Sequence, residues 1–329
     1  MRRQISVAEL RTEGQILFDK TVFPLILKCE TPDATLEETT GWVREHSAEL
    51  DSLAFQHGAV LLRRFPVADF NDFDAVIRAC GLPNFRYEDS LSNAVRVVKT
   101  ERVFTANEAP PEVTIFLHHE MAQTPIYPSK LLFYCEQAAE TGGATPLCRS
   151  DKLYELMQRE IPDFAHDCET KGLQYTNVMP GFDDPKSGMG RSWQSTFKAQ
   201  TQAEAEARMR ELNYSWDWLP DGSLKAATPV LQAVRDLGDG RKSFFNQLIA
   251  AYKGWKDDRN DPSKSIRHGD GSILDPDAVM KCAELAEQVT FDLHWQNGDV
   301  AIVDNYVAMH GRRTFTGTRK VLASLVAAE

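Results

Sequence analysis

The sequence predicts a mainly β fold with helices (α+β), in which a jelly roll is decorated by peripheral helices. Segments typical of strands are separated by long, partly helical insertions, and a closing set of strands lies near the C-terminal end. Strands and helices do not alternate, and no Gly-rich loop follows a strand, so a doubly wound α/β fold fits less well. Because there is no internal repeat or low-complexity linker, we expect residues 1–329 to form a single domain.

Helices are predicted where apolar residues recur at helical spacing between start and stop signals. The segment before Gly81 is the clearest case, because five apolar side chains share one face and glycine then ends the helix. Ser150 and Asp151 are expected to cap a helix, and Asp275 with Pro276 opens another. The predicted helices are residues 36–55, 69–80, 150–159 and one that starts at Asp275.

Strands are predicted where β-branched and apolar residues lie between turn signals. Asn297-Gly298 supplies positive-φ turn residues between two such runs, which predicts a hairpin at residues 289–304. The predicted strands are residues 59–62, 95–104, 113–117, 130–135, 289–295, 299–304 and 321–326.

Composition excludes several classes of function. The net charge of −11 and the isoelectric point near 5.3 disfavour a nucleic-acid partner, which requires a basic face. No apolar run approaches the ~18–20 residues of a membrane span, and the N-terminal residues lack the apolar core of a secretory signal. The six cysteines are dispersed, which is typical of reduced structural thiols. We therefore expect a soluble, cytoplasmic protein that acts on a small molecule.

The stretch around His118 is the most informative for chemistry. Residues two apart on a strand face the same way, so His118 and Glu120 converge while His119 points to the other side. An imidazole and a carboxylate side by side are two of the three ligands of the 2-His-1-carboxylate triad of Fe(II) oxygenases. A paired histidine and glutamate without a metal is the alternative interpretation of so short a motif.

A distant segment offers the missing parts of such a site. His310 lies late in the predicted jelly roll, and Arg319 opens the next strand, so both can face one cavity. The histidine would complete the triad, and the planar guanidinium could hold a dicarboxylate through two hydrogen bonds. The Gly142-Gly143 turn delivers the hydroxyl of Thr145 close after a buried strand.

These motifs resemble those of the Fe(II)/2-oxoglutarate-dependent dioxygenases of the taurine dioxygenase superfamily, and most of all its clavaminate synthase-like branch. The similarity covers about residues 50–326 in family order, with matches at residues 57–65, 103–108, 118–122, 142–146, 193–197, 244–246 and 298–325. It implies a double-stranded β-helix with His118, Glu120 and His310 as iron ligands. It also implies that Arg319 and Thr145 hold the distal carboxylate of the cosubstrate 2-oxoglutarate.

Two positions depart from known members of that superfamily. Taurine dioxygenases carry a second arginine, which grips a sulfonate, at the position that Ala323 occupies here. Halogenases of the family replace the acidic ligand by a small residue so that chloride can bind iron, whereas this chain keeps Glu120. We therefore expect neither taurine as the substrate nor halogenation as the reaction.

The resemblance implies that O2 and 2-oxoglutarate are consumed and that succinate and CO2 are released. The reaction would oxidise a C–H bond of a small, amino-acid-derived metabolite by hydroxylation, desaturation or oxidative cyclisation of the kainoid-synthase type. Arg191, Asn246 and Arg96 are the expected substrate contacts, and Asp304 with Asn305 should orient the turn before His310. The alternatives are a zinc hydrolase with the same ligands and a non-catalytic jelly roll that binds a metal or ligand.

Overall fold

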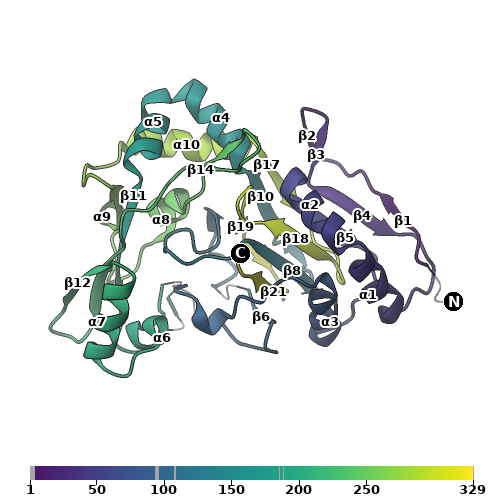
Figure 1. Cartoon of the computed structure of the whole chain (residues 1–329), viewed down its shortest axis with the longest axis horizontal. Helices are drawn as coiled ribbons and strands as arrows, with labels where there is room; N and C mark the ends of the chain where they lie inside the picture. The colour runs from purple at the N-terminus through teal and green to yellow at the C-terminus, as the bar shows by residue number, and fades with distance from the viewer. Residues whose placement is uncertain (1–3, 93–95, 107–108, 185, 188, 329) are drawn as a thin grey trace.

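Two β-sheets form the centre of the computed structural model, which describes residues 4–92, 96–106, 109–184, 186–187 and 189–328 (Figure 1). In this part of the chain the larger sheet has seven strands and the smaller sheet has four. The larger sheet runs β1 (Val7–Glu9), β4 (Leu25–Cys29), β5 (Ala59–Arg63), β18 (Val300–Asp304), β8 (Lys130–Gln137), β21 (Lys320–Val326) and β6 (Phe104–Thr105). The smaller sheet runs β17 (Thr290–Leu293), β10 (Thr145–Arg149), β19 (Ala308–Arg312) and β7 (Ile115–His118).

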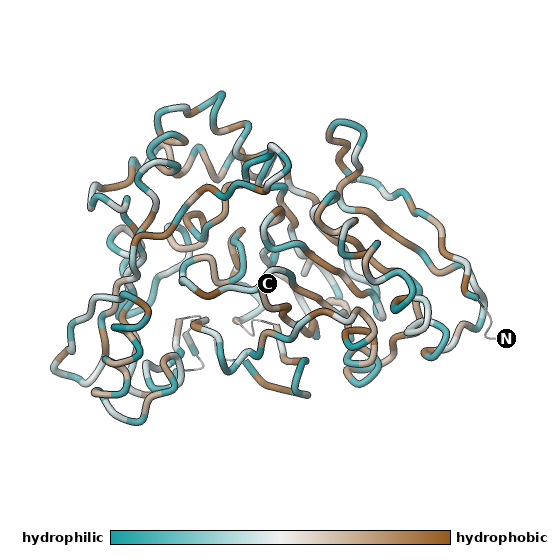
Figure 2. Tube along the Cα trace, viewed as in Figure 1, coloured by the Kyte–Doolittle hydropathy of each residue, from teal (hydrophilic) through white to brown (hydrophobic). Residues whose placement is uncertain are grey.

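Strand β8 shows how the sheets build the core. Leu131, Phe133 and Cys135 belong to an apolar cluster that also holds Leu147 of β10 and Leu293 of β17, so they face the smaller sheet. The residues between them lie in a second cluster on the outer face, beneath helices. Because successive side chains point to opposite faces, a strand buried on both faces is apolar throughout. Figure 2 shows this concentration of hydrophobic residues along the central strands. The predicted jelly roll with peripheral helices is confirmed.

Three helices cover the outer face of the larger sheet: α1 (Leu36–Glu45), α2 (Ser47–His57) and α3 (Phe70–Cys80). Helix α3 has the predicted signals, since Asp69 accepts hydrogen bonds from two backbone N–H groups and Gly81 is left-handed at φ 70°. The single helix predicted at 36–55 is wrong, because the helix is broken at His46. The His46 backbone N–H donates to the Trp42 carbonyl oxygen at the C-terminal end of α1. The His46 ring nitrogen Nδ1 lies 2.8 Å from the same oxygen.

Four helices pack on the outer face of the smaller sheet: α4 (Ser150–Glu160), α5 (Pro162–Lys171), α8 (Leu248–Gly254) and α10 (Pro276–Gln288). Asp275 caps α10 as predicted. The predicted cap of α4 is wrong, because the helix starts at Ser150 without a side-chain cap. The carboxylate of Asp151 instead binds two guanidinium groups, those of Arg149 and Arg241.

A separate sheet, seen at the left of Figure 1, forms a lobe beside the jelly roll. Its apolar face packs against α6 and α7. Its strands are β12 (Ser215–Trp218), β13 (Leu224–Ala227), β11 (Leu173–Met179) and β16 (Ile266–His268), and the two helices are α6 (Trp193–Phe197) and α7 (Gln202–Glu211). The remaining short elements are η1 (Tyr87–Asp89), α9 (Pro262–Ser265), β2 (Ile16–Phe18), β3 (Thr21–Phe23), β9 (Thr141–Gly142), β14 (Arg235–Asp236), β15 (Lys242–Ser243) and β20 (Phe315–Thr316).

Two strand predictions need correction. The expected hairpin at 289–304 does not form, because β17 pairs with β10 in the smaller sheet while β18 lies between β5 and β8 in the larger one. The turn at Gly298, with φ 88°, therefore carries the chain from one sheet to the other. Of the predicted strand 95–104, Val95 lies outside the described residues and only Phe104 enters a strand. Val97 and Val98 are exposed, at 47% and 56%, and Val98 pairs with Phe104 of β6 only through an isolated bridge, so the segment does not extend the sheet as a strand.

All six cysteines are buried free thiols, as their dispersed spacing predicts. Within the described ranges, none of the helices combines the length and the apolar character needed to cross a bilayer.

Candidate active site

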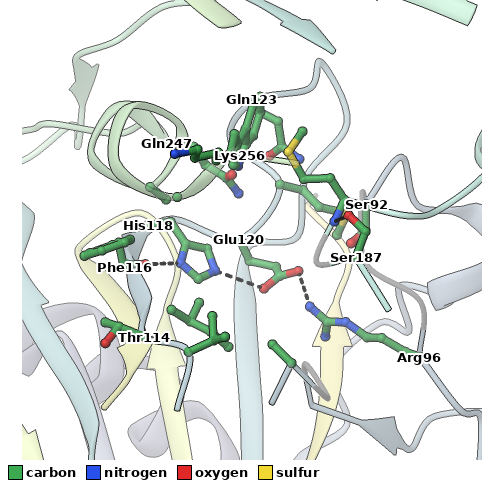
Figure 3. A pocket seen from close by; sticks show the side chains of 18 residues that line it. Ser92, Arg96, Thr114, Phe116, His118, Glu120, Gln123, Ser187, Gln247 and Lys256 are labelled. Atoms are coloured by element: carbon green, nitrogen blue, oxygen red, sulfur yellow. Dashed lines mark hydrogen bonds and ion pairs between the residues drawn. The ribbon is translucent and has the colours of Figure 1, made fainter. Parts of the chain in front are cut away.

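The smaller sheet brings the predicted ligands together. Strands β7 and β19 are antiparallel neighbours, and their register sets His118 directly opposite His310. The two imidazole rings are 4.3 Å apart between centroids. Glu120 lies two residues after the end of β7, and the next residue, Met121, adopts a left-handed conformation with φ 56°. The Glu120 carboxylate points back toward both imidazole rings. Figure 3 shows His118 and Glu120 facing each other across the cavity.

The distances suit a small cation. Glu120 Oε2 lies 3.4 Å from His310 Nε2 and 3.9 Å from His118 Nε2, and all three ligand atoms lie within 4.8 Å of one another. Ligand atoms about 2.0–2.2 Å from one metal ion are separated by roughly 3 Å when they coordinate at right angles. Among the described residues this is the sole cluster of three such side chains with that spacing.

The protonation states also favour a metal. Burial raises the pKa of Glu120, but Arg96 and the two histidines outweigh it and hold that pKa below its usual value. Burial and the neighbouring His310 lower the pKa of His118 to about 4. At neutral pH the cluster therefore presents a carboxylate and a neutral imidazole, the forms that coordinate metals. His118 Nδ1 lies 2.7 Å from the Phe116 carbonyl oxygen, which can only accept, so Nδ1 carries the proton and Nε2 is free to coordinate.

Asn305 locks the turn that carries Glu120. Its side-chain oxygen accepts from the Glu120 backbone N–H at 2.7 Å, and its amide nitrogen donates to the carbonyl oxygens of Glu120 and Pro128. The Asn305 carbonyl accepts from His119 Nδ1. The turn stabilised by Asn305 is thus the one at Glu120, not the one before His310 as expected. His119 is not part of the cluster of His118, Glu120 and His310, as predicted. Its ring packs against the Phe245 ring, with the two ring centroids 4.7 Å apart.

Arg319 and Thr145 meet in a cavity beside the ligands. Arg319 Nη2 lies 3.2 Å from the Thr145 hydroxyl, and Arg319 Nε donates to the Gly143 carbonyl at 2.9 Å. Gly143 has φ 70°, and a Cβ there would come within 3.2 Å of the Arg319 side chain, so the turn requires glycine. The cavity holds about 490 Å³ of empty space, including solvent at its mouth, and the three predicted ligands also line it.

Arg319 is a cation without an anionic partner in the described part of the chain, where it contacts the Gly143 carbonyl and the Thr145 hydroxyl. Burial, with a smaller effect of Arg312, lowers its pKa to about 10, so it remains charged at neutral pH. A buried cation is costly unless an anion accompanies it, so this cavity suits a carboxylate. Trp295, which the sequence reasoning missed, donates its indole N–H to Thr145 Oγ1 at 2.9 Å. No sequence signal pointed to Trp295, because it follows β17 and reaches Thr145 across the sheet.

A second cavity also borders Glu120 (Figure 3). It shares Arg96, His118 and Glu120 with the first cavity, so the two meet at the ligand cluster. Its walls carry polar side chains, two cations and several apolar groups. The labelled lining residues are Ser92, Arg96, Thr114, Phe116, His118, Glu120, Gln123, Ser187, Gln247 and Lys256.

Of the three expected substrate contacts, only Arg96 lines this cavity. The Arg191 guanidinium donates to the Ser90, Ser92 and Ser195 carbonyl groups, so it braces the segment that carries Ser92 to the wall. The Asn246 side chain donates to the Ala233 carbonyl and accepts from the backbone at the start of α8. Its neighbour Gln247 reaches the cavity instead, and the sequence alone did not distinguish these adjacent amides.

Known proteins with similar sequences agree with the resemblance described above. The family described as taurine catabolism dioxygenase TauD, TfdA family matches residues 21–325. A clavaminate synthase-like protein of Arabidopsis thaliana is 40% identical over 309 residues, covering 94% of this chain and 93% of the relative. The dapdiamide synthesis protein DdaC of Enterobacter agglomerans is 27% identical over 315 residues, covering 92% and 90%.

Solved structures show the same fold at low sequence identity. The PvcB protein of Pseudomonas aeruginosa matches with a TM-score of 0.55 at 15% identity, covering 100% of this chain and 93% of that one. An asparagine oxygenase solved with Fe(II), hydroxyasparagine and succinate matches with a TM-score of 0.53 at 13% identity, covering 89% and 83%.

Proposed function

We propose, from the premise that this chain belongs to the taurine catabolism dioxygenase TauD/TfdA family and is an Fe(II)- and 2-oxoglutarate-dependent dioxygenase, that its substrate is a small amino acid or amino-acid derivative. The observation that carries the proposal is the meeting of two cavities at one ligand cluster. One cavity contains Arg319, a buried cation with no anionic partner among the described residues, which suits it to a cosubstrate carboxylate. The other is polar and has room for a second small molecule.

The proposed roles follow from the contacts. His118, Glu120 and His310 would hold Fe(II), and Arg319 with Thr145 would hold the distal carboxylate of 2-oxoglutarate. Fe(II) bound there supplies the O2 activation that couples decarboxylation of 2-oxoglutarate to C–H oxidation. The negative charge of Glu120 would partly neutralise the charge of Fe(II). Asn305 holds the Glu120 backbone through two hydrogen bonds and so keeps the carboxylate in place. Glu120 and His310 are buried, which limits their contact with bulk water.

The second cavity supports an amino-acid substrate. Lys256 is exposed at its edge and has no ion pair among the described residues, so it can receive a carboxylate. The Gln123 side-chain oxygen is buried and has no hydrogen-bond partner in the described structure. An ammonium group is a donor that would satisfy this oxygen, so a zwitterion matches both groups. The names of two similar proteins, an asparagine oxygenase and a dapdiamide synthesis protein, point to the same class.

The test is succinate release by the Fe(II)-loaded protein in the presence of O2, 2-oxoglutarate and a library of amino acids and their derivatives. We expect a subset of these compounds to stimulate succinate formation. Product mass then separates hydroxylation, which adds one oxygen, from desaturation or ring closure, which removes two hydrogens. Zn²⁺ in place of Fe(II) should give no turnover. Hydrolysis of a compound by the Zn²⁺ form, without O2 uptake by the Fe(II) form, would refute the proposal.

Two variants test the substrate class once a substrate is found. Gln123→Leu and Lys256→Met should each raise KM for the amino acid while the Kd of 2-oxoglutarate stays the same, because neither residue lines the cosubstrate cavity. Lys264→Met is the matched control, since Lys264 is an exposed lysine that pairs with Asp261. Unchanged KM values in both variants would exclude the zwitterion.

A further inference from the structure

The two oxygens of Glu120 have different partners. Oε2 is the oxygen that faces the Nε2 atoms of His118 and His310, at 3.9 and 3.4 Å. Oε1 accepts a hydrogen bond from Arg96 Nη2 at 2.9 Å. Figure 3 shows Arg96 reaching Glu120 from the side opposite His118. One carboxylate is thus divided between a metal-facing oxygen and an arginine-facing oxygen.

Arg96 is built into this position. Only 7% of its side chain is exposed, and its guanidinium lies over the rings of Tyr87 and Phe104, at 5.5 and 5.4 Å from their centroids. Glu120 is the one acidic side chain with which it pairs in the described structure. Since a buried arginine is strongly destabilising without a counter-charge, the pair with Glu120 fixes both side chains.

The division of the carboxylate decides how many positions remain on a bound metal. A carboxylate can coordinate through one oxygen or through both. With two histidines and a single glutamate oxygen, an octahedral ion keeps three open positions, and with both oxygens it keeps two. A 2-oxoglutarate chelate would occupy two of these positions, so a position for O2 would remain only if Glu120 contributed one oxygen.

We propose that Arg96 is a positioning residue that keeps Glu120 a one-oxygen ligand, and that it thereby preserves the coordination position needed for O2. This inference rests on the proposed function of the ligand cluster. Arg96 touches neither the expected metal position nor the cosubstrate carboxylate; it acts through Glu120. Its place in the wall shared by both cavities lets it do so without blocking either one.

The test counts exchangeable waters on Mn(II) by water-proton relaxation, a readout that requires no turnover. The wild-type protein should carry three such waters and retain one after 2-oxoglutarate binds. Arg96→Met should carry two and retain none, while its Mn(II) affinity is equal or higher. Arg96→Lys keeps a charged donor and should restore the wild-type count. With an accepted substrate, kcat of Arg96→Met should fall at least tenfold while the Kd of 2-oxoglutarate changes less than threefold.

Arg191→Met is the matched control, because Arg191 is another buried arginine on the Tyr87 ring, at 5.1 Å, that does not contact Glu120. Its water count should equal that of the wild type. If Arg96→Met does not fold, Arg96→Gln replaces it, since the shorter amide cannot reach Glu120 as arginine does. A wild-type water count in Arg96→Met, or in Arg96→Gln where that variant replaces it, would overturn the inference. Failure of the wild type to bind Mn(II), or binding that survives His310→Ala, would instead overturn the proposed function.

Discussion

Replacement of Arg319 by leucine removes the only cation proposed to grip the cosubstrate. The guanidinium has five N–H donors. The Nε–H donates to the Gly143 carbonyl, and one Nη2 hydrogen donates to the Thr145 hydroxyl. The remaining Nη1 and Nη2 hydrogens are therefore available to a carboxylate. A hydrogen bond to a charged group contributes about 1.5–3 kcal/mol. Loss of this grip should therefore weaken 2-oxoglutarate binding roughly ten- to hundredfold.

Anaerobic titration of the metal-loaded protein with 2-oxoglutarate measures this change directly. Arg313→Leu is the matched control, because Arg313 pairs with Glu287 and Asp292 outside the cavity and its loss should leave the Kd unchanged. We expect the melting temperature of Arg319→Leu to be equal to or higher than that of the wild type, since folding buries this cation without an anionic partner among the described residues. An unchanged Kd in Arg319→Leu would refute the reasoning and direct attention to Arg312, which lines the same cavity.

Three further predictions concern the ligands and their surroundings. His118→Ala and His310→Ala should each abolish tight Fe(II) binding in equilibrium dialysis, whereas His119→Ala should retain it; the opposite pattern would place the ligands on the other face of the strand. Thr145→Val should lower the free energy of unfolding by about 1–3 kcal/mol, because the Trp295 N–H loses its acceptor, and Thr145→Ser should restore it in urea denaturation. The free energy of unfolding of the metal-free protein should decrease as the pH falls from about 6.5 towards 4. His118 and His119 should each contribute a decrease of up to about 1.4 kcal/mol per pH unit. The reason is that burial lowers the pKa of His118 to about 4 and that of His119 to about 3. In this pH window the unfolded chain therefore binds protons that the folded chain does not. Equal unfolding free energies at about pH 7 and about pH 5.5 would contradict this prediction.

Strand periodicity and family order predicted that His118, Glu120 and His310 would lie together, although the local geometry differs from the expectation. His118 is the last residue of β7, so Glu120 does not face His118 by strand alternation alone. Asn305 turns the glutamate back, through hydrogen bonds between residues 185 positions apart. No pattern within one segment contains that information, because it depends on how β19 docks beside β7.

The failed hairpin has a similar cause. Asn297-Gly298 is a true turn, but turn chemistry fixes only the local bend and leaves the choice of partner strand open. Strand β17 pairs with β10, far upstream, because both bury their apolar faces against the larger sheet. Arg191 and Asn246 show the same limit at single side chains. A polar residue in a family motif can line the site or satisfy backbone groups behind it, and only the packed structure separates these roles.

The position of β21 and β19 in the chain sets when the site can exist during protein synthesis. Ribosomes add about 5–20 residues per second, so the roughly 190 residues between Glu120 and His310 take about 10 to 40 s to make. Throughout that interval, Asn305 is missing from the glutamate turn and β8 lacks its β21 neighbour. The nascent chain thus contains only two of the three proposed ligands, His118 and Glu120, and they lie on a segment that Asn305 does not yet stabilise. On the proposed ligand assignment, metal loading waits until the C-terminal strands have emerged and docked, and a chain truncated before β19 should stay metal-free whatever the metal supply.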